Sequence, residues 1–175
     1  MTNSVGILLA AGSASRFGSN KLLHPLPDGV AIGIAAATAL IQALPHSIAV
    51  VKPGDQLLIN AFNKLGIRVI ENPRAHEGMG TSLAAGVNAT ADASGWLIAL
   101  ADMPRIKPAT ICALAEKLNN GASIVAPVFE SQRGHPVGFS SYWREQLQSL
   151  TGDKGARDLI TKNAYEMELL MTEDA

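Results

Sequence analysis

The sequence predicts an α/β fold built on a mostly parallel sheet. Short apolar runs alternate along the chain with longer segments of helical pattern, and this alternation is typical of β-α units. The first run, 5–10, is apolar almost throughout, which favours a central parallel strand with both faces buried. The chain has 175 residues, of which 47% are hydrophobic and 17% charged, so it can bury one substantial core. We therefore expect a single domain over residues 1–175.

The first half of the chain is expected to hold three strands and three helices. The strands are expected at 5–10, 47–51 and 67–70, and the helices at 31–44, 56–65 and 81–91. Pro45 ends the Ala-rich first helix, and Gly66 ends the second as a residue just past the C-cap. Thr81 or Ser82 is expected to cap the third helix, because hydroxyl side chains are favoured at that position.

The second half continues the same alternation. The strands are expected at 96–101, 123–128, 135–140 and 165–171, and the helices at 108–119, 142–150 and 153–163. Pro108 suits the first turn of its helix, and one of two interpretations of the last helix has Asp153 as its N-cap. The runs 123–128 and 135–140 are near enough in the chain to form a hairpin, so the sheet is expected to be mixed.

Composition argues against several classes of protein. The formal net charge is -1 and no basic stripe is present, so electrostatic binding to nucleic acid is not expected. The first apolar run is too short for a membrane span and no basic flank precedes it, so no signal peptide is expected. The single cysteine, Cys112, cannot form an internal disulfide and is expected to be a small buried hydrophobe. These features fit a cytoplasmic protein.

The first strand leads into a loop suited to a polyphosphate. Gly12 and Gly18 carry no Cβ to obstruct the approach of a phosphate to backbone N–H groups. Arg16 offers a planar fork for phosphate oxygens and Lys21 a compact positive charge. The spacing excludes a P-loop, because Lys21 does not directly follow a glycine, and the dinucleotide pattern G-x-G-x-x-G is absent. The simpler alternative is a glycine-rich turn with solvated basic side chains.

This loop resembles the signature of a known enzyme family. Leu9-Ala10-Ala11-Gly12, Arg16, Gly18 and Lys21 resemble the motif L-x-A-G-x-x-x-R-x-G-x-x-K of nucleotidyltransferases with a Rossmann-like GT-A fold. Within them the residues are most similar to the molybdenum cofactor cytidylyltransferases and their guanylyltransferase relatives. The resemblance implies a three-layer α/β/α fold and Mg²⁺-dependent nucleotidyl transfer. It implies catalytic roles for Lys21, Arg16 and Asp102.

Asp102 follows the apolar run 96–101 and is a candidate Mg²⁺ ligand. Mg²⁺ prefers oxygen ligands and usually takes one or two carboxylates together with substrate phosphates. The sequence Asp102-Met103-Pro104 resembles the metal-binding motif of the same family. The alternative is that Asp102 only caps a turn toward the next helix.

A second loop resembles the nucleotide loop of the cytidylyltransferases. It runs from Asn72-Pro73 to Gly78-Met79-Gly80-Thr81-Ser82-Leu83, against a family pattern N-P-x-x-x-x-G-M-x-x-S-L. Hydroxyls and free N–H groups at a helix N-terminus suit an anion, although a helix cap with a flexible lead-in would look the same. The expected nucleotide-binding residues are Leu9, Ala10, Ala11, Gly12, Ser13, Gly18, Lys21, Asn72, Gly80, Thr81 and Ser82.

Two further segments are candidates for binding the acceptor. Arg133 and His135 flank a turn with Gly134 and Pro136, and a G-H-P segment lies on the acceptor side in the family. Lys154 and Arg157 belong to a G-D-x-G-A-R motif that resembles the cytidylyl branch. Basic residues at a helix start oppose the helix dipole, which favours a role in holding an anion. A role-free turn histidine and a solvated basic turn remain the alternatives.

The resemblance implies transfer from an NTP to the phosphate of molybdopterin cofactor with release of pyrophosphate. The guanylyl branch usually reads L-A-G-G where this chain reads Leu9-Ala10-Ala11-Gly12, and this difference favours CTP. The resemblance also implies transient contact with a molybdenum hydroxylase as the client. GTP as donor, or a sugar or polyol phosphate as acceptor, are the alternatives within the enzyme class. A non-catalytic carrier of molybdenum cofactor is the alternative from another class.

Overall fold

Four parallel strands form one half of the sheet. In the computed structural model, which describes residues 4–12 and 20–174, β1 (Ser4–Leu9) lies between β2 (Ile48–Val51) and β4 (Gly95–Leu100). The edge strand β3 (Arg68–Glu71) pairs with β2, and all four strands are parallel. Every residue of β1 is buried, which confirms its expected central position.

The other half of the sheet is mixed, as expected. β7 (Val137–Ser140) lies antiparallel between β4 and β5 (Ile124–Phe129), and β6 (Gln132–Arg133) folds back on the end of β5. The last strand, β8 (Met167–Met171), pairs parallel with β5. Among the described residues the strand order is β3-β2-β1-β4-β7-β5-β6, with β8 beside β5.

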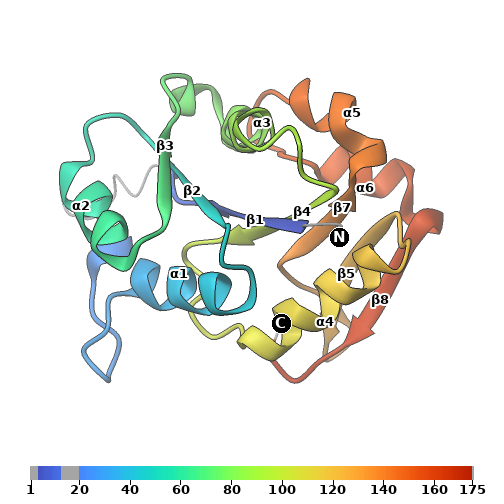
Figure 1. Ribbon diagram of the computed structural model, residues 1–175, viewed down its shortest axis with the longest axis horizontal. Helices are drawn as coiled ribbons and strands as arrows, with labels where there is room; N and C mark the ends of the chain where they lie inside the picture. Colours follow the sequence, from blue (N-terminus) through green and yellow to red (C-terminus); the bar gives the residue numbers. More distant parts are fainter. Residues whose placement is uncertain (1–3, 13–19, 175) are drawn as a thin grey trace.

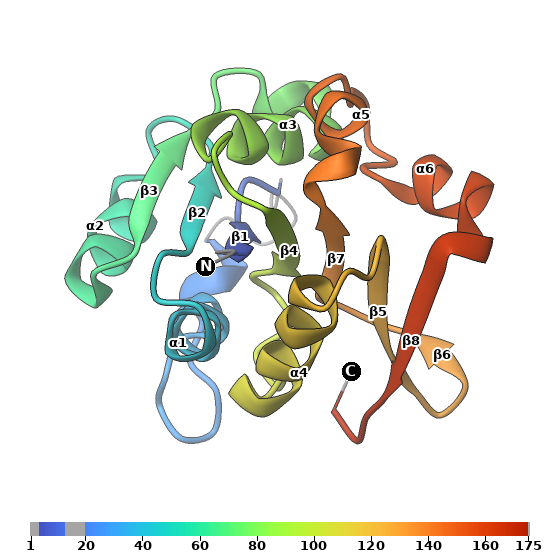
Figure 2. The same ribbon diagram turned by 45° about the vertical axis from the view of Figure 1, so that its right-hand side comes forward.

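The helices cover both faces of this sheet (Figure 1). One buried cluster includes residues of α1, α2 and α4, and a second cluster on the opposite face includes residues of α3, α5 and α6. Figure 2 shows the same separation, with α1 and α4 below the sheet and α3 and α5 above it. The three-layer α/β/α fold is therefore confirmed. The helix bounds are α1 Ile32–Ala43, α2 Gln56–Leu65, α3 Met79–Ala89, α4 Pro108–Asn119, α5 Arg144–Gln148 and α6 Arg157–Lys162.

The alternation of side chains along β1 explains how one strand serves two cores. Ile7 and Leu9 belong to the cluster under α3, whereas Leu8 belongs to the cluster under α1. Gly6 allows α1 to approach closely, because a Cβ there would lie 2.7 Å from Leu40 Cδ1. In the part of the chain that the structure describes, no helix is both long enough and apolar enough to cross a bilayer.

Several expectations about helix starts were wrong. α3 begins at Met79 with Gly78 as its N-cap, so Thr81 and Ser82 lie inside the first turn and neither is the cap. α6 begins at Arg157 after an N-cap at Ala156, so Asp153 is not a cap either. The bounds expected for α2 and α4, in contrast, are confirmed.

Cys112 is exposed, which corrects the expectation that it is buried. The inward face of α4 is formed by Ile111, Leu114, Ala115 and Leu118. This spacing of three and four residues leaves position 112 on the outer face of the helix. The apolar pattern correctly predicts the helix, but the buried face of that helix is narrower than the pattern indicates and does not include Cys112.

The N-terminus of α4 is held by a carboxylate from the end of the described chain. Asp174 accepts hydrogen bonds from Lys107 N at 2.5 Å and from Thr110 Oγ1 at 2.7 Å. The N-cap residue Lys107 makes no side-chain capping bond of its own. A carboxylate at this end of a helix also interacts favourably with the helix dipole.

We expect Asp174→Ala to lower the free energy of unfolding by about 1 kcal/mol, the usual effect of removing a helix cap. A thermal melt should show a decrease in Tm of about 2–4 °C for a chain of this size. The neighbouring exposed residue provides the control, and Glu173→Ala should leave Tm nearly unchanged. Equal shifts for the two variants would contradict the capping role.

Candidate active site

A cleft lies where β1 and β4 end. Leu9 and Leu100 are paired in the sheet, so the segments that follow these two strands leave at the same edge. The cleft has a volume of about 640 Å³, which is within the usual range for small-molecule sites. Its lining residues are Leu9, Ala10, Ala11, Gly12, Lys21, Leu22, Ala75, His76, Gly78, Met79, Ser82, Leu100, Asp102 and Asp153.

Two opposite charges meet on one wall of this cleft. Lys21 Nζ lies 3.9 Å from Asp102 Oδ2, and the two side chains are 55% and 51% exposed. An ion pair this exposed contributes little to folding stability. The two groups are therefore available to a ligand: the ammonium can bind phosphate oxygens and the carboxylate can bind a cation.

Local structure fixes where each of the two charges lies. Asp102 comes two residues after the end of β4, and the N–H of Ala101 donates to Leu9 O at 3.1 Å. Lys21 begins a short 3-10 turn whose N-cap is Asn20, which accepts a hydrogen bond from Leu22 N at 3.0 Å. The Asn20 amide also donates to Asp55 at the start of α2. These bonds hold Lys21 beside the end of β4.

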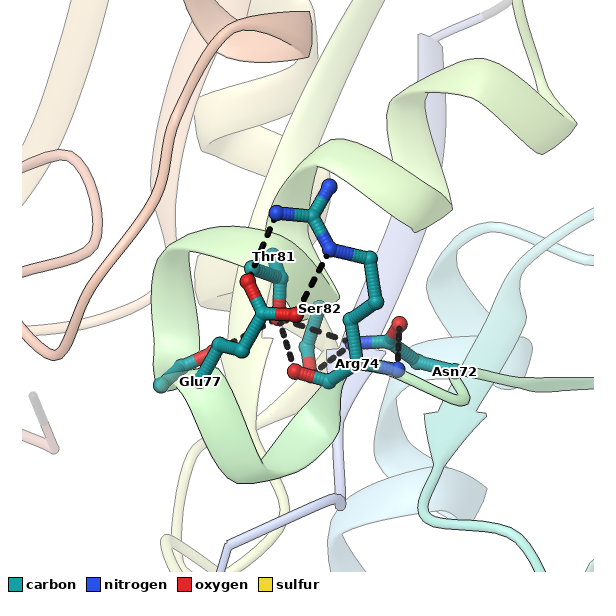
Figure 3. A network of polar contacts seen from close by, with 6 residues as sticks. Asn72, Arg74, Glu77, Thr81 and Ser82 are labelled. Carbon is teal, nitrogen blue, oxygen red and sulfur yellow. Dashed lines mark hydrogen bonds and ion pairs between the residues drawn. The ribbon is translucent and has the colours of Figure 1, made fainter.

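The loop that leads into α3 also lines the cleft, and Figure 3 shows the polar contacts within it. Asn72, which is 3% exposed, donates to Thr81 Oγ1 and to Ser82 Oγ, both at 3.0 Å. Arg74 and Glu77 form a two-point ion pair on the outside of the loop, with distances of 2.9 and 2.6 Å. The hydrogen bond from Arg74 holds the pKa of the Glu77 carboxyl below its ordinary value.

The start of α3 also packs directly on the segment before α6. Gly80 N donates to Gly152 O at 2.8 Å, and a Cβ on Gly80 would lie 2.7 Å from the carbonyl of Thr151. Gly78 has a φ of +113°, and a Cβ there would lie 2.3 Å from the backbone of Gly152. Only glycine fits these two positions without moving backbone. This contact brings Asp153 into the cleft beside the loop.

We expect Gly80→Ala to destabilise the protein by about 1–3 kcal/mol, the usual cost of inserting a methyl group into a close contact. The added Cβ meets backbone atoms, which cannot move away as a side chain would. Urea unfolding would measure the loss. Gly12→Ala is the control, because an added Cβ there meets no described atom within 4 Å; a similar loss in both variants would contradict the packing argument.

The cleft contains many but not all of the residues expected to bind nucleotide. Leu9, Ala10, Ala11, Gly12, Lys21 and Ser82 line it, and so does Asp102, the expected metal ligand. Ser13, Arg16 and Gly18 lie outside the described residues. Asn72, Gly80 and Thr81 are buried behind the cleft wall and support it rather than line it. The direct roles expected for these three residues stay predictions.

The candidate acceptor residues lie outside the cleft lining. Lys154 and Arg157 are exposed, and Lys154 Nζ lies 3.4 Å from Asp158 Oδ2 in α6. Arg133 is exposed in β6. Burial lowers the pKa of His135, Arg133 adds to the lowering, and Asp102 acts in the opposite direction. A lowered pKa favours neutral imidazole at pH 7, which is a weak partner for an anion.

Some cleft residues were not anticipated. Ala75, His76 and Met79 line the cleft from the loop before α3 and from its first turn, and Asp153 lines it from the adjoining segment before α6. The motif around Gly78 and the motif around Asp153 both drew attention to these segments. Within these segments the sequence favours basic and hydroxyl side chains as anion ligands, and this criterion points to Lys154 and not to Asp153 beside it.

The residues of the cleft fit a divalent cation held with the help of a ligand. Asp102 and Asp153, the two carboxylate residues of the cleft, both line it. In the described part of the chain, no three His, Cys, Asp or Glu side chains come together as a complete metal site. One or two carboxylates completed by phosphate oxygens is the usual arrangement for Mg²⁺.

Comparison with known proteins agrees with this geometry. Residues 6–167 match the model of the MobA-like NTP transferase domain. The chain belongs to this family. Nucleotidyltransferase is therefore its established class, and nucleotides are the small molecules that this class binds.

Two curated relatives and two solved structures illustrate the similarity. The chain is 28% identical to nicotine blue oxidoreductase of Paenarthrobacter nicotinovorans, over 97% of this chain and 87% of the relative. It is 30% identical to the purine catabolism protein PucB of Bacillus subtilis, over 89% and 80%. The crystal structure of Rv0371c from Mycobacterium tuberculosis superposes with a TM-score of 0.84 at 25% identity, covering 99% and 90%. A second structure of Rv0371c contains manganese and superposes with a TM-score of 0.81 at 24% identity, covering 99% and 90%.

Proposed function

We propose that the protein transfers a cytidylyl group from CTP to the terminal phosphate of molybdopterin cofactor, in a Mg²⁺-dependent reaction that releases pyrophosphate. The observation that carries this proposal is the meeting of Lys21 and Asp102 at 3.9 Å in the cleft at the ends of β1 and β4. One group suits a triphosphate and the other suits its metal ion. Ala11 and the Gly78-Met79 pair support CTP as the donor.

Nucleotidyl transfer needs positioning and charge neutralisation more than covalent chemistry from the protein. An acceptor phosphate oxygen attacks the α-phosphorus, and the bond from that phosphorus to the β-phosphate oxygen breaks. Both electrons of that bond leave with pyrophosphate. The attacking oxygen is already anionic, so no general base is required.

Lys21, Gly12 and Asp102 share this work with Arg16, which lies outside the described residues. Lys21 holds the β- and γ-phosphates and neutralises the pyrophosphate as it leaves, and we assign Arg16 to the same task. The backbone after β1, from Ala11 onward, approaches the phosphates closely because Gly12 carries no side chain. Asp102 would hold Mg²⁺, which when bound neutralises phosphate charge and orients the triphosphate. A molybdenum hydroxylase is the client enzyme that we propose receives the product.

Pyrophosphate release from CTP, GTP and ATP tests the proposal, each with Mg²⁺ and each with and without molybdenum cofactor. Release from CTP only when the cofactor is present is the expected result. Release from GTP instead would keep the reaction and overturn the choice of nucleotide. No release together with direct cofactor binding would favour a carrier. No release and no binding would point to another acceptor, with sugar and polyol phosphates tested next.

A further inference from the structure

The buried amide of Asn72 has a fixed orientation (Figure 3). Its Oδ1 accepts a hydrogen bond from Arg74 N at 3.0 Å. A backbone N–H can only donate, so the amide oxygen must face Arg74 and the amide nitrogen must face the two hydroxyls of α3. An amide nitrogen is a donor with no acceptor capacity. Thr81 Oγ1 and Ser82 Oγ therefore both accept hydrogen bonds from Asn72.

The two hydroxyls differ in what they do with their own protons. Thr81 Oγ1 lies 2.8 Å from Arg74 O and 2.9 Å from Gly78 O, so its proton is used inside the loop. Ser82 Oγ accepts from Asn72, and no acceptor for its proton is found among residues 4–12 and 20–174. Ser82 also lines the cleft, whereas Thr81 does not. The direction that remains for the Ser82 proton is into the cleft.

We propose that Asn72 is a positioning residue that makes the Ser82 hydroxyl a hydrogen-bond donor to the nucleotide in the cleft. The wall at Ser82 then selects an acceptor atom of the ligand and disfavours an N–H group. This inference rests on the proposed function only in that a nucleotide occupies the cleft. Asn72 does not line the cleft, so its effect on the nucleotide passes through Ser82.

The residue type at position 72 decides the polarity of this contact. A carboxylate in place of the amide would accept the Ser82 proton, because an ionised Asp has no proton to donate. The lone pairs of Ser82 would then face an acceptor on the ligand. Asn72→Asp keeps the side-chain shape and reverses the contact, whereas Ser82→Ala removes it.

A double-mutant cycle on nucleotide affinity tests the proposal. Calorimetry would give Kd for CTP, GTP and ATP with Mg²⁺, and the tightest of the three would be used with each variant. We expect Ser82→Ala to weaken binding about fivefold, the effect of one neutral hydrogen bond. Asn72→Asp should weaken binding at least as much. Its effect in the Ser82→Ala background should be smaller by about the same fivefold factor.

The cycle separates this role from general damage. Any repulsion between a new carboxylate and the nucleotide is present in both backgrounds and cancels in the comparison. Thr81→Val is the matched control, because it disturbs the same buried network without turning the Ser82 proton, and its effect should multiply with that of Ser82→Ala. If Asn72→Asp does not fold, Asn72→Ala replaces it. Alanine frees the Ser82 hydroxyl and does not reverse it, so we expect a smaller loss of affinity than for Asn72→Asp, and a loss that is again reduced in the Ser82→Ala background.

Equal fold-losses for Asn72→Asp in the two backgrounds would overturn the inference and leave the proposed function standing. Failure of the wild-type protein to bind any of the three nucleotides would overturn both. Inorganic triphosphate identifies the atom that Ser82 contacts. A fivefold loss that persists with triphosphate assigns a phosphate oxygen, and a loss seen only with the nucleotide assigns an acceptor on the base or ribose; each supports the donor role.

Discussion

Lys21→Ala is expected to lower kcat/KM for nucleotidyl transfer by about 10²–10³, the usual cost of removing one preorganised group that stabilises developing charge. Lys21 is the positive charge that faces the cleft from the turn after β1, 3.9 Å from Asp102. As pyrophosphate leaves, negative charge builds on it and the ammonium becomes more important than in the ground state. Most of the loss should therefore appear in kcat rather than in KM.

The fold should survive this change. The Lys21 side chain is 55% exposed and its ion pair is of the weak surface kind. Urea unfolding of Lys21→Ala should match the wild type within about 0.5 kcal/mol, as for surface substitutions in general. Lys64→Ala, an exposed lysine of α2 that does not line the cleft, controls for loss of a positive charge. Unfolding of Lys21→Ala, or a similar loss of rate in both variants, would show that the placement of Lys21 is wrong.

Strands and helices were predictable where a single physical signal dominated. The continuous apolar character of β1 identified a strand buried on both faces, and Pro108 marked the start of α4. α3 started earlier than expected because Gly78, with its φ of +113°, supplies the entry to the helix, while Thr81 and Ser82 are buried in the first turn. The preference of hydroxyls for caps is a local rule. Packing against the segment at Gly152, which is distant in the chain, was not visible to it.

The candidate site divides in the same way. The placement of Lys21 and Asp102 at one edge of the sheet followed from the rule that parallel strands end together, and the cleft contains both. Asn72 is expected to touch nucleotide because of its motif, and in the structure its amide nitrogen donates hydrogen bonds to Thr81 and Ser82. Which face of a loop turns inward depends on tertiary contacts. Motif spacing locates the loop but does not assign each of its side chains to the ligand or to the protein.

Asp102→Asn is expected to have the second large effect, a fall in Mg²⁺-dependent turnover of about 10³-fold, since a metal ion at a phosphoryl centre supplies several kcal/mol of charge stabilisation. The amide keeps the shape of the side chain and removes the charge that would hold the cation. The apparent Mg²⁺ requirement should rise together with the fall in rate. Lys21, no longer paired with a carboxylate, should keep its affinity for the triphosphate, so the defect should lie in metal binding and rate.

Metal binding can be measured apart from turnover. Titration with Mn²⁺, followed by electron paramagnetic resonance in the presence of nucleotide, should show weaker binding in Asp102→Asn than in the wild type. Asp153→Asn is the informative comparison, because Asp153 also lines the cleft but comes from the segment that packs on α3. A large loss for Asp102 alone would mean that one carboxylate and the phosphates hold the cation. Losses for both would mean that the two carboxylates share it, and full activity of Asp102→Asn would remove Asp102 from the site.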